Sequence, residues 1–409
     1  MIIQPAHRTE NVREYYFSTK NKEIAKLSQE RMAKGLRPVI NLGIGSPDGT
    51  PPRSAIDALC KEAVKDGVHG YQSYTGIPEL RNSFVKWYAD YYKVTLDPAC
   101  EIQPLTGSKE GILIASLAFL NKGDKVLVPD PGYPTYSSAS LMVEAEMVKY
   151  DLLPDKGWTP DWDALESMDL SGVKMMWTNY PGMPTGAKAS KELYRRIVDF
   201  ARRHKILVIN DNPYSFILNE EPLSILEVPG AKECCLEMNS LSKAHNMAGW
   251  RIGMIAGAQD YIKEILKVKS QLDSGMFRAL QVAAVEALSQ GPEWFRVLNA
   301  EYRRRKDVVW RIFDMLGAEY ERDTAGLFVW GRVTPETLLR LGIDDADPAE
   351  EASSTPVSQL VSDRILYGCG VFITPGFIFG RNGEGYIRAS LCAPVPTLEM
   401  AEKAIKDSL

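Results

Sequence analysis

The chain has 409 residues, of which 45% are hydrophobic and 25% charged, and this composition predicts a large globular core spread over more than one domain. Its formal net charge of -5 provides no global positive field to attract nucleic acid. No stretch approaches the roughly 18 apolar residues of a membrane span, and the N-terminus lacks a signal-peptide pattern. Six dispersed cysteines without a CxxC pair, and four histidines without ligand spacing, predict reduced thiols, a cytoplasmic location and no metal site.

In the middle of the chain, between residues 104 and 257, short apolar runs alternate with helical patterns. The runs expected to form strands are 125–129, 173–181, 205–211, 234–240 and 251–257. Between them, 190–204 has apolar residues at helical spacing. Strands that are apolar on both faces and alternate with helices predict an α/β fold with a buried, mostly parallel sheet.

After residue 292 the pattern changes to a long helix over 293–316 followed by shorter strand-like pieces. We therefore expect a large domain over 50–290 and a smaller α+β domain made of 1–49 together with 291–409. The polar stretch 342–356 is typical of a mobile loop or an insertion.

Four of the apolar runs end in residues that turn sharply, donate hydrogen bonds or carry charge. These ends are "PDPGYPTY" (129–136), "NYPGMPTG" (179–186), "DNPY" (211–214) and "SLSK" (240–243). Ligands of open α/β sheets bind beyond the carboxyl ends of the strands. The sequence therefore predicts that the four ends meet in one crevice.

Lys243 is the first candidate catalytic residue, because it directly follows a strand among small and apolar neighbours. Partial desolvation there would lower the pKa of its amine and make it a nucleophile. Ser240 adds a hydroxyl, and Arg251 adds a guanidinium that matches phosphate. A lone lysine is usually a surface charge, but this triplet suits a phosphate-bearing aldehyde held as a Schiff base.

Asp211 ends a buried strand, where a carboxylate needs a partner such as a protonated pyridine nitrogen. A helix cap is the alternative role. Tyr214 follows three residues later and could donate to a ring oxygen. The stretch 106–120 opens an amphipathic helix with glycine and small polar residues, which is either an anion site or a simple cap. Tyr133 could stack on a flat ring or pack in the core.

Together these pieces resemble the pyridoxal-phosphate-dependent aminotransferases of fold type I, class I/II, over about residues 37–395. The landmarks and their order are similar, and the match looks closest to the branch of LL-diaminopimelate, alanine and aspartate aminotransferases. Besides "SLSK" and "DNPY", the landmarks are "NLGIGSPD" (41–48), "HGYQSYTGIPELR" (69–81), "TGSKEG" (106–111), "PDPGYP" (129–134), "GWR" (249–251) and "GYIRASL" (385–391). The resemblance implies a mostly parallel, seven-stranded sheet flanked by helices, beside the smaller α+β domain.

The resemblance also implies that Lys243 forms an aldimine with pyridoxal 5'-phosphate and carries the proton between substrate and cofactor in a ping-pong transamination. For the cofactor ring, it implies that Asp211 contacts the ring nitrogen, Tyr214 contacts the 3-oxygen and Tyr133 stacks on the ring. For the phosphate, it implies contacts from Ser240, from Arg251 and from the backbone of Gly107, Ser108 and Lys109. It also implies that Tyr71 reaches the phosphate of a neighbouring subunit. The implied assembly is a homodimer with shared active sites.

For the substrates, an α-amino acid and a 2-oxo acid, the resemblance implies that Arg388 clamps the α-carboxylate and that Gly45 lets the backbone approach it. Alanine–glutamate exchange, an LL-diaminopimelate reaction and reactions of methionine or aromatic amino acids all remain open, and the resemblance favours the first two. Two other functions remain as alternatives: a pyridoxal-phosphate-dependent C–S β-lyase, and a non-enzymatic cofactor-binding module.

The chain departs from the family's pattern at Met183. The family usually has N-P-T-G at the end of this strand, and its asparagine donates to the cofactor 3-oxygen. Here the segment reads Met183-Pro184-Thr185-Gly186, and methionine has no donor. We therefore expect Tyr214 to contact that oxygen alone or with water, and the pKa of the aldimine to be raised.

Overall fold

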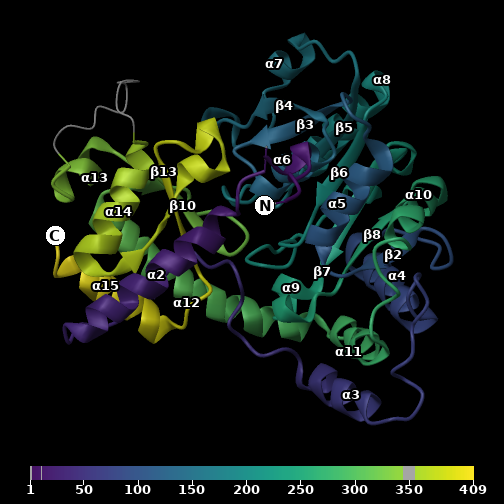
Figure 1. The fold of residues 1–409 in the computed structure, drawn as a ribbon, viewed down its shortest axis with the longest axis horizontal. Helices are drawn as coiled ribbons and strands as arrows, with labels where there is room; N and C mark the ends of the chain where they lie inside the picture. The colour runs from purple at the N-terminus through teal and green to yellow at the C-terminus, as the bar shows by residue number, and fades with distance from the viewer. Residues whose placement is uncertain (1, 11, 344–354) are drawn as a thin grey trace.

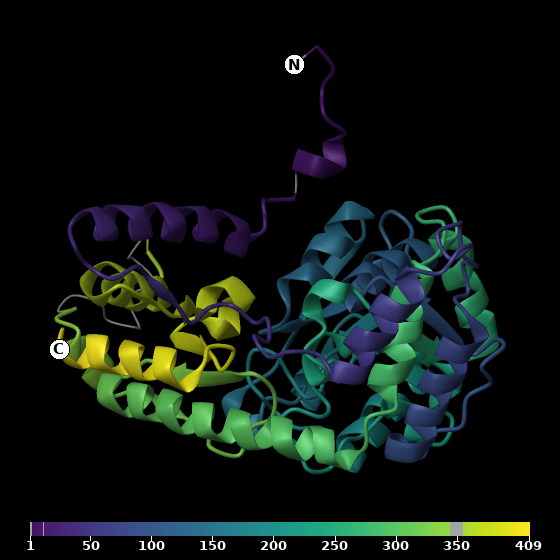
Figure 2. The same cartoon turned by 90° about the horizontal axis from the view of Figure 1, so that it is seen from below.

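The structure is a computed structural model that describes residues 2–10, 12–343 and 355–409, and its elements form two lobes (Figure 1). The larger lobe contains a seven-stranded sheet, and the smaller one a four-stranded sheet. α12 (Pro292–Leu316), which confirms the helix predicted at 293–316, extends along both lobes (Figure 2). The stretch predicted as a mobile loop, 342–356, lies for the most part outside the described residues.

The large sheet has the strand order β2-β8-β7-β6-β5-β3-β4. Its strands are β2 (Ile102–Leu105), β3 (Lys125–Asp130), β4 (Glu146–Asp151), β5 (Val173–Thr178), β6 (Leu207–Asp211), β7 (Cys235–Ser240) and β8 (Gly253–Gly257). β4, β3, β5, β6 and β7 run parallel, whereas β8 pairs antiparallel with both β7 and β2. The mostly parallel, seven-stranded sheet is confirmed, and each of the five predicted runs supplies one of its strands.

Alternating burial explains why these runs form a sheet with helices on both faces. In β3, Val126 and Val128 belong to one core cluster and Leu127 to another, so both faces of the strand are covered. The helices of this lobe are α3 (Arg53–Ala63), α4 (Pro78–Tyr92), α5 (Ser108–Phe119), α6 (Pro134–Met142), α7 (Trp162–Ser167), α8 (Lys191–His204), α9 (Leu241–Ala244), α10 (Gln259–Lys269) and α11 (Arg278–Leu288). α8 confirms the helix predicted at 190–204, and it starts where the Ser190 hydroxyl accepts a hydrogen bond from the Leu193 amide at 3.0 Å.

The smaller lobe has an antiparallel sheet in the order β12-β13-β10-β9. Its strands are β9 (Glu319–Tyr320), β10 (Phe328–Arg332), β12 (Thr374–Pro375) and β13 (Tyr386–Ser390), and beside them β1 (Ile40–Asn41) pairs in parallel with β11 (Val371–Phe372). The remaining helices are α1 (His7–Glu10), α2 (Tyr16–Ala33), α13 (Pro335–Arg340), α14 (Val357–Cys369) and α15 (Val395–Lys406). The β1–β11 pair brings the N-terminal segment into this lobe.

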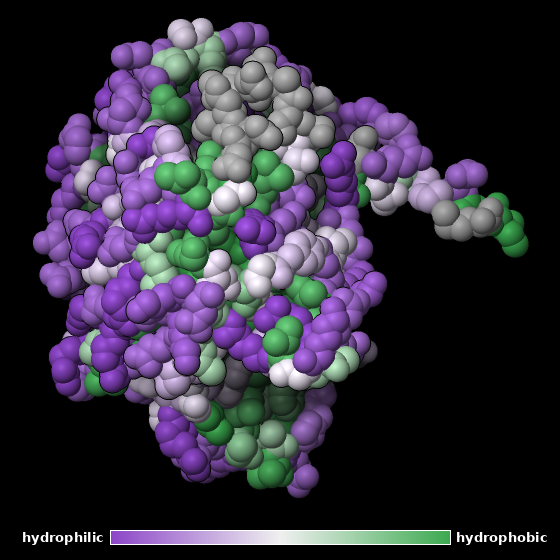
Figure 3. Space-filling model, turned by 90° about the vertical axis from the view of Figure 1, so that its left-hand side faces the viewer, coloured by the Kyte–Doolittle hydropathy of each residue, from purple (hydrophilic) through white to green (hydrophobic). Residues whose placement is uncertain are grey.

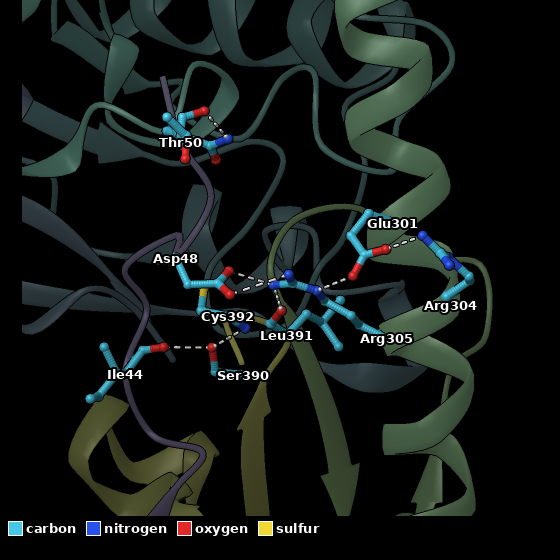
Figure 4. Close-up of polar contacts among 10 residues, drawn as sticks. Ile44, Asp48, Thr50, Glu301, Arg304, Arg305, Ser390, Leu391 and Cys392 are labelled. Atoms are coloured by element: carbon cyan, nitrogen blue, oxygen red, sulfur yellow. Dashed lines mark hydrogen bonds and ion pairs between the residues drawn. The ribbon is translucent and has the colours of Figure 1, made fainter. Parts of the chain in front are cut away.

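Arg305 on α12 joins two segments that lead into the space between the lobes (Figure 4). Its guanidinium donates to the Asp48 carboxylate at 2.5 and 3.3 Å, to Glu301 at 3.0 Å and to the Leu391 carbonyl at 3.1 Å. Ser390 donates in turn to the Ile44 carbonyl at 2.5 Å. Since Arg305 is buried, these charge-assisted bonds fix the 44–48 segment against the end of β13.

The molecular surface is mostly hydrophilic on the side formed by the smaller lobe, where hydrophobic residues gather only in small patches (Figure 3). The N-terminal tail extends away from the body and carries the exposed Ile2 and Ile3 (Figures 2 and 3). In the described part of the chain, no helix is long and apolar enough to cross a membrane. The same residues include no group of three or more potential metal ligands.

Candidate active site

The carboxyl ends of β3, β5, β6 and β7 meet at one cavity of about 330 Å³. Each of the four predicted strand ends contributes lining residues, so their convergence is confirmed. The wall also includes residues of the smaller lobe and of the segment 15–21. Ten of the twelve residues singled out from the sequence line this cavity: Gly45, Ser108, Lys109, Tyr133, Asp211, Tyr214, Ser240, Lys243, Arg251 and Arg388.

Lys243 lies in the short helix that follows β7, with its side chain directed across the cavity toward the smaller lobe. Its Nζ donates to the Gly45 carbonyl at 2.5 Å and lies 5.9 Å from the centroid of the Tyr214 ring. Burial lowers the pKa of this ammonium, and the positive charges of Arg388 and Arg251 lower it further. A larger share of neutral, nucleophilic amine follows from the lowered pKa.

Asp211, the last residue of β6, has a carboxylate in which only one of the two oxygens accepts a hydrogen bond. Oδ2 accepts from the Tyr136 hydroxyl at 3.0 Å, whereas Oδ1 is buried without a partner among the described residues. Burial raises the pKa of this carboxyl group to about 7, although the Tyr136 bond and Lys243 lower it. An orphaned, buried carboxylate oxygen at a cavity wall is the arrangement that a protonated ring nitrogen would satisfy.

The N-terminus of α5 forms a backbone cradle beside Arg251. Gly107 precedes the helix with φ 82°, a left-handed conformation that favours glycine, and the guanidinium of Arg251 lies close to its Cα. Arg251 donates to the Ala248 carbonyl at 2.9 Å and more distantly to the Thr106 carbonyl at 3.4 Å. Free amides, a helix dipole and a guanidinium at one place can bind a phosphate group.

Ser240 and Arg251 differ in detail from the sequence prediction. The Ser240 hydroxyl donates to Ser242 Oγ at 2.8 Å and to the Ile252 carbonyl at 3.1 Å. It also accepts from the Ser242 amide at 3.1 Å and thereby caps α9. Arg251 does not open a strand as predicted, because it adopts a left-handed conformation two residues before β8. This turn directs its side chain back toward the α5 N-terminus.

Arg388 on β13 is buried in a largely aromatic environment. Its guanidinium carbon lies 3.9 Å from the centroid of the Phe328 ring and 4.7 Å from that of Phe379. Nη2 donates to the Gly43 carbonyl at 3.0 Å, and Nε has no partner in the part of the chain that the structure describes. Burial lowers the pKa of Arg388 to about 10, so the cation is held in place with unused donors.

Met183 contacts Arg388 directly, since Nη1 of the arginine lies 3.2 Å from the methionine sulfur. Its turn is held by Asn179, which accepts from the Met183 amide at 2.8 Å and donates to the Asp211 carbonyl at 2.6 Å. The substitution of the family's usual asparagine therefore places a weak acceptor beside the buried guanidinium.

Tyr71 and Gly107 are the two singled-out residues that do not line the cavity. Gly107 borders it through the backbone, as described above. Tyr71 is 93% exposed and lies outside the cavity. Within a single chain, the structure therefore does not bring Tyr71 to the other candidate residues.

Sequence reasoning missed several residues of the cavity wall: Tyr15, Phe17, Asn21, Tyr136 and Asn179. Asn179 and Tyr136 had a signal, because both lie within the strand-end segments already quoted. Tyr15 and Phe17 had none, since no local pattern predicts that α2 and the residue before it reach a pocket over 200 residues away in sequence from Lys243. In the structure the ammonium of Lys109 lies 4.4 Å from the centroid of the Tyr15 ring.

The fold is the α/β arrangement of a mostly parallel seven-stranded sheet beside a smaller α+β lobe, with one cavity at the carboxyl ends of its strands. The sequence profile of the family described as aminotransferase class I and II matches residues 37–406. The chain therefore belongs to the class I and II aminotransferases, a family that depends on pyridoxal phosphate, and it catalyses transamination.

Similar proteins agree with this assignment over almost the full length. An LL-diaminopimelate aminotransferase of Dehalococcoides mccartyi (strain 195) is 39% identical over 96% of this chain and 95% of its own. That of Desulforudis audaxviator is 38% identical over 100% of this chain and 99% of its own.

Solved structures show the same fold. A substrate-bound BacF structure from Bacillus subtilis has a TM-score of 0.87 at 30% identity, covering 100% of this chain and 98% of its own. A probable N-succinyldiaminopimelate aminotransferase of Thermus thermophilus has a TM-score of 0.81 at 29% identity, covering 95% of this chain and 100% of its own.

Proposed function

We propose that this aminotransferase binds pyridoxal 5'-phosphate in the cavity and transfers an amino group from LL-diaminopimelate to a 2-oxo acid. The observation that carries the binding site is the meeting of Lys243, Asp211 and Arg388 around one cavity. The choice of LL-diaminopimelate is supported by the near full-length similarity to relatives that are named for this reaction. Alanine–glutamate exchange is the alternative substrate pair.

The residues present fit the cofactor. The unpartnered Oδ1 of Asp211 accepts from the ring nitrogen, and the ring of Tyr133 packs against the ring face. The backbone of Gly107, Ser108 and Lys109, together with Ser240 and Arg251, holds the phosphate, and Tyr214 donates to the 3-oxygen. When bound, the cofactor supplies a conjugated, electron-withdrawing system that stabilises negative charge at the substrate α-carbon.

The chain's own groups bind the substrate and move its protons. Arg388 binds the α-carboxylate by a bidentate pair. Gly45, which has no side chain, lets the backbone approach that carboxylate. Lys243 Nζ takes the proton from the α-carbon, because its lowered pKa leaves a share of the amine free to act as a base. The first oxo acid leaves before the second binds at the same Arg388, and the enzyme keeps the amino group in between, so we expect ping-pong kinetics.

The active unit is a homodimer with shared sites. Tyr71 supports this proposal, because its exposed ring lies outside the cavity of its own chain and is free to reach the phosphate site of a neighbouring subunit. We assign 50–290 to a large domain and 1–49 with 291–409 to a small one. The confinement of the large sheet to 102–257, and the β1–β11 pairing, support that division.

The test is a panel of single amino acids mixed with the cofactor-loaded enzyme without any acceptor. We expect LL-diaminopimelate to convert the absorbance of the bound cofactor to that of its aminated form, and Lys243→Ala to abolish the conversion. If alanine and glutamate convert it and LL-diaminopimelate does not, the substrate proposal is wrong. Release of pyruvate and ammonia from cysteine conjugates without an acceptor would instead indicate the β-lyase reaction.

A further inference from the structure

Asp130, the last residue of β3, joins the large sheet to the segment 379–382 of the smaller lobe. Its side chain is buried. Oδ2 accepts from the Arg381 amide at 3.0 Å, and Oδ1 accepts from the Asn382 amide at 2.9 Å. Two successive backbone amides on one carboxylate form charge-assisted bonds that hold the main chain itself, whatever side chains the segment carries.

Two further hydrogen bonds fasten the same segments together. The Gly132 amide donates to the Phe379 carbonyl at 2.8 Å, and the Asn382 side chain donates to the Asp130 carbonyl at 3.1 Å. Gly380 has φ 133°, a conformation that favours glycine, and the chain there passes directly against the Asp130 carboxylate. Residues 130–132 and 379–382 therefore form a continuous backbone contact, called here the interlobe junction, rather than a single ion pair.

Each side of the interlobe junction continues directly into a residue of the catalytic cavity. On the large-lobe side, Tyr133 follows Gly132. On the other side, Phe379 is buried, and its ring centroid lies 4.7 Å from the guanidinium carbon of Arg388. Both Tyr133 and Phe379 line the cavity around Lys243. The junction therefore fixes a ring beside the guanidinium of the smaller lobe relative to a ring at the strand ends of the large sheet.

The two sides of the interlobe junction are not held equally well without the Asp130 carboxylate. The backbone of Asp130 is fixed by the large sheet, where it pairs with Asp151 in the register of β3 and β4. The segment 379–382 instead belongs to two short 3-10 turns, η5 (Gly376–Phe379) and η6 (Arg381–Gly383). Loss of the carboxylate should therefore displace the segment 379–382 and leave the sheet in place.

We propose that Asp130 is a positioning residue for transamination. It does not line the catalytic cavity. It acts by holding Phe379 against Arg388, so that the guanidinium meets the substrate carboxylate at a set distance from the cofactor ring. The inference rests on the proposed function, in which Arg388 binds the α-carboxylate. Because a displacement of about 1 Å can lower a reaction rate by about a hundredfold, bonds to the backbone itself are the suitable means of holding this geometry.

The experiment measures how tightly a carboxylate binds, without turnover. 2-Oxoglutarate, a 2-oxo acid, is titrated by calorimetry into protein loaded with the aldehyde form of the cofactor, which has no amino group to transfer. Asp130→Ala should bind 2-oxoglutarate about tenfold or more weakly than wild type. Its affinity for the cofactor should change by less than about threefold, because none of the residues proposed to hold the cofactor lies in the segment 379–382.

Three variants separate positioning from stability. Lys149→Met removes an ammonium 3.0 Å from Oδ2 of Asp130 and leaves both amide bonds, so it should lower the urea midpoint without changing the affinity for 2-oxoglutarate. Gly380→Ala keeps the carboxylate but strains the segment at φ 133°, and it should weaken binding as Asp130→Ala does. Asp130→Asn keeps one acceptor oxygen and should give an intermediate affinity, which preserves the test if Asp130→Ala does not fold.

Arg388→Met tests the carboxylate site itself in the same titration and should bind 2-oxoglutarate more weakly than any Asp130 variant. If Arg388→Met binds it as wild type does, the carboxylate role of Arg388 in the proposed function is wrong, and the positioning role of Asp130 falls with it. If Arg388→Met binds weakly while the Asp130 and Gly380 variants bind as tightly as wild type, only the positioning role is wrong. Equal weakening by Lys149→Met and Asp130→Ala would show a general loss of structure and would also overturn that role.

Discussion

Replacing Arg388 with methionine should strongly impair the reaction and yet make the protein more stable. The guanidinium is 3% exposed, and burial lowers its pKa from 12.5 to about 10. At 1.36 kcal/mol per pKa unit, this shift of 2.5 corresponds to about 3 kcal/mol by which the folded state disfavours the charged form. Because the side chain is almost fully buried, solvent screening does not reduce this figure much.

Methionine removes the charge, but it also loses two contacts that the arginine side chain makes. The hydrogen bond to the Gly43 carbonyl contributes about 1 kcal/mol. The position over the Phe328 ring contributes about another 1 kcal/mol. The remainder, about 1 kcal/mol, is the expected gain in unfolding free energy for Arg388→Met, whose side chain fills most of the same volume without a charge.

Urea unfolding at equal protein and cofactor concentrations measures the gain. At a denaturant slope of about 3 kcal/mol/M, 1 kcal/mol raises the midpoint by roughly 0.3 M. The difference between variant and wild type should be constant from pH 6 to 9, because Arg388 is protonated in both folded and unfolded states there. Above pH 10 it should shrink, since the folded protein then releases the proton and the destabilisation fades.

The control is Arg381→Met, which changes an exposed arginine of the same lobe and should leave the midpoint within about 0.2 M. In the activity assay, Arg388→Met should lower kcat/KM roughly 30- to 5000-fold, because the α-carboxylate loses its buried partner. This corresponds to a loss of about 2–5 kcal/mol of transition-state stabilisation. A lower urea midpoint for Arg388→Met than for wild type at pH 7 would refute the reasoning. It would mean that the contacts of the guanidinium outweigh its desolvation.

Three further predictions follow from neighbouring residues. Met183→Asn should lower the pKa that a spectral pH titration of the bound cofactor measures. An amide N–H would donate to the cofactor 3-oxygen, and the phenolate would then stabilise the protonated imine less. Superimposable titration curves would place residue 183 away from the 3-oxygen. In the cofactor-free protein, burial raises the pKa of Asp211 to about 7. As the pH rises from 4 through 7, the unfolding free energy of wild type should therefore fall by up to about 4 kcal/mol relative to that of Asp211→Asn. An equal change in Tm between pH 5 and pH 8 for the two proteins would contradict this. Arg305→Met should cost about 2–4 kcal/mol of unfolding free energy by leaving the Asp48 carboxylate unpaired, and a double-mutant cycle with Asp48→Asn should give a coupling of at least about 1 kcal/mol; additive effects would show that the pair is not coupled.

The sequence by itself determined the large sheet and most of the site within it. Apolar runs between helical patterns identify buried strands, because a strand covered on both faces is hydrophobic throughout its length. The residues after each run then identify the crevice, since parallel strands end at the same edge of the sheet. Lys243 and Asp211 were found in this way, each at or within a few residues of the strand end that positions it.

Only the tertiary structure decided what faces those strand ends. An apolar run predicts a buried strand but not the direction of that strand in the sheet. The antiparallel orientation of β8 and the turn at Arg251 therefore could not be predicted from the local sequence. Met183 meets the guanidinium of Arg388, and Tyr15 and Phe17 close the cavity wall, through contacts between segments far apart in the chain. The physical reason is that such contacts arise when whole lobes bury their apolar faces together, which no local pattern of residues records.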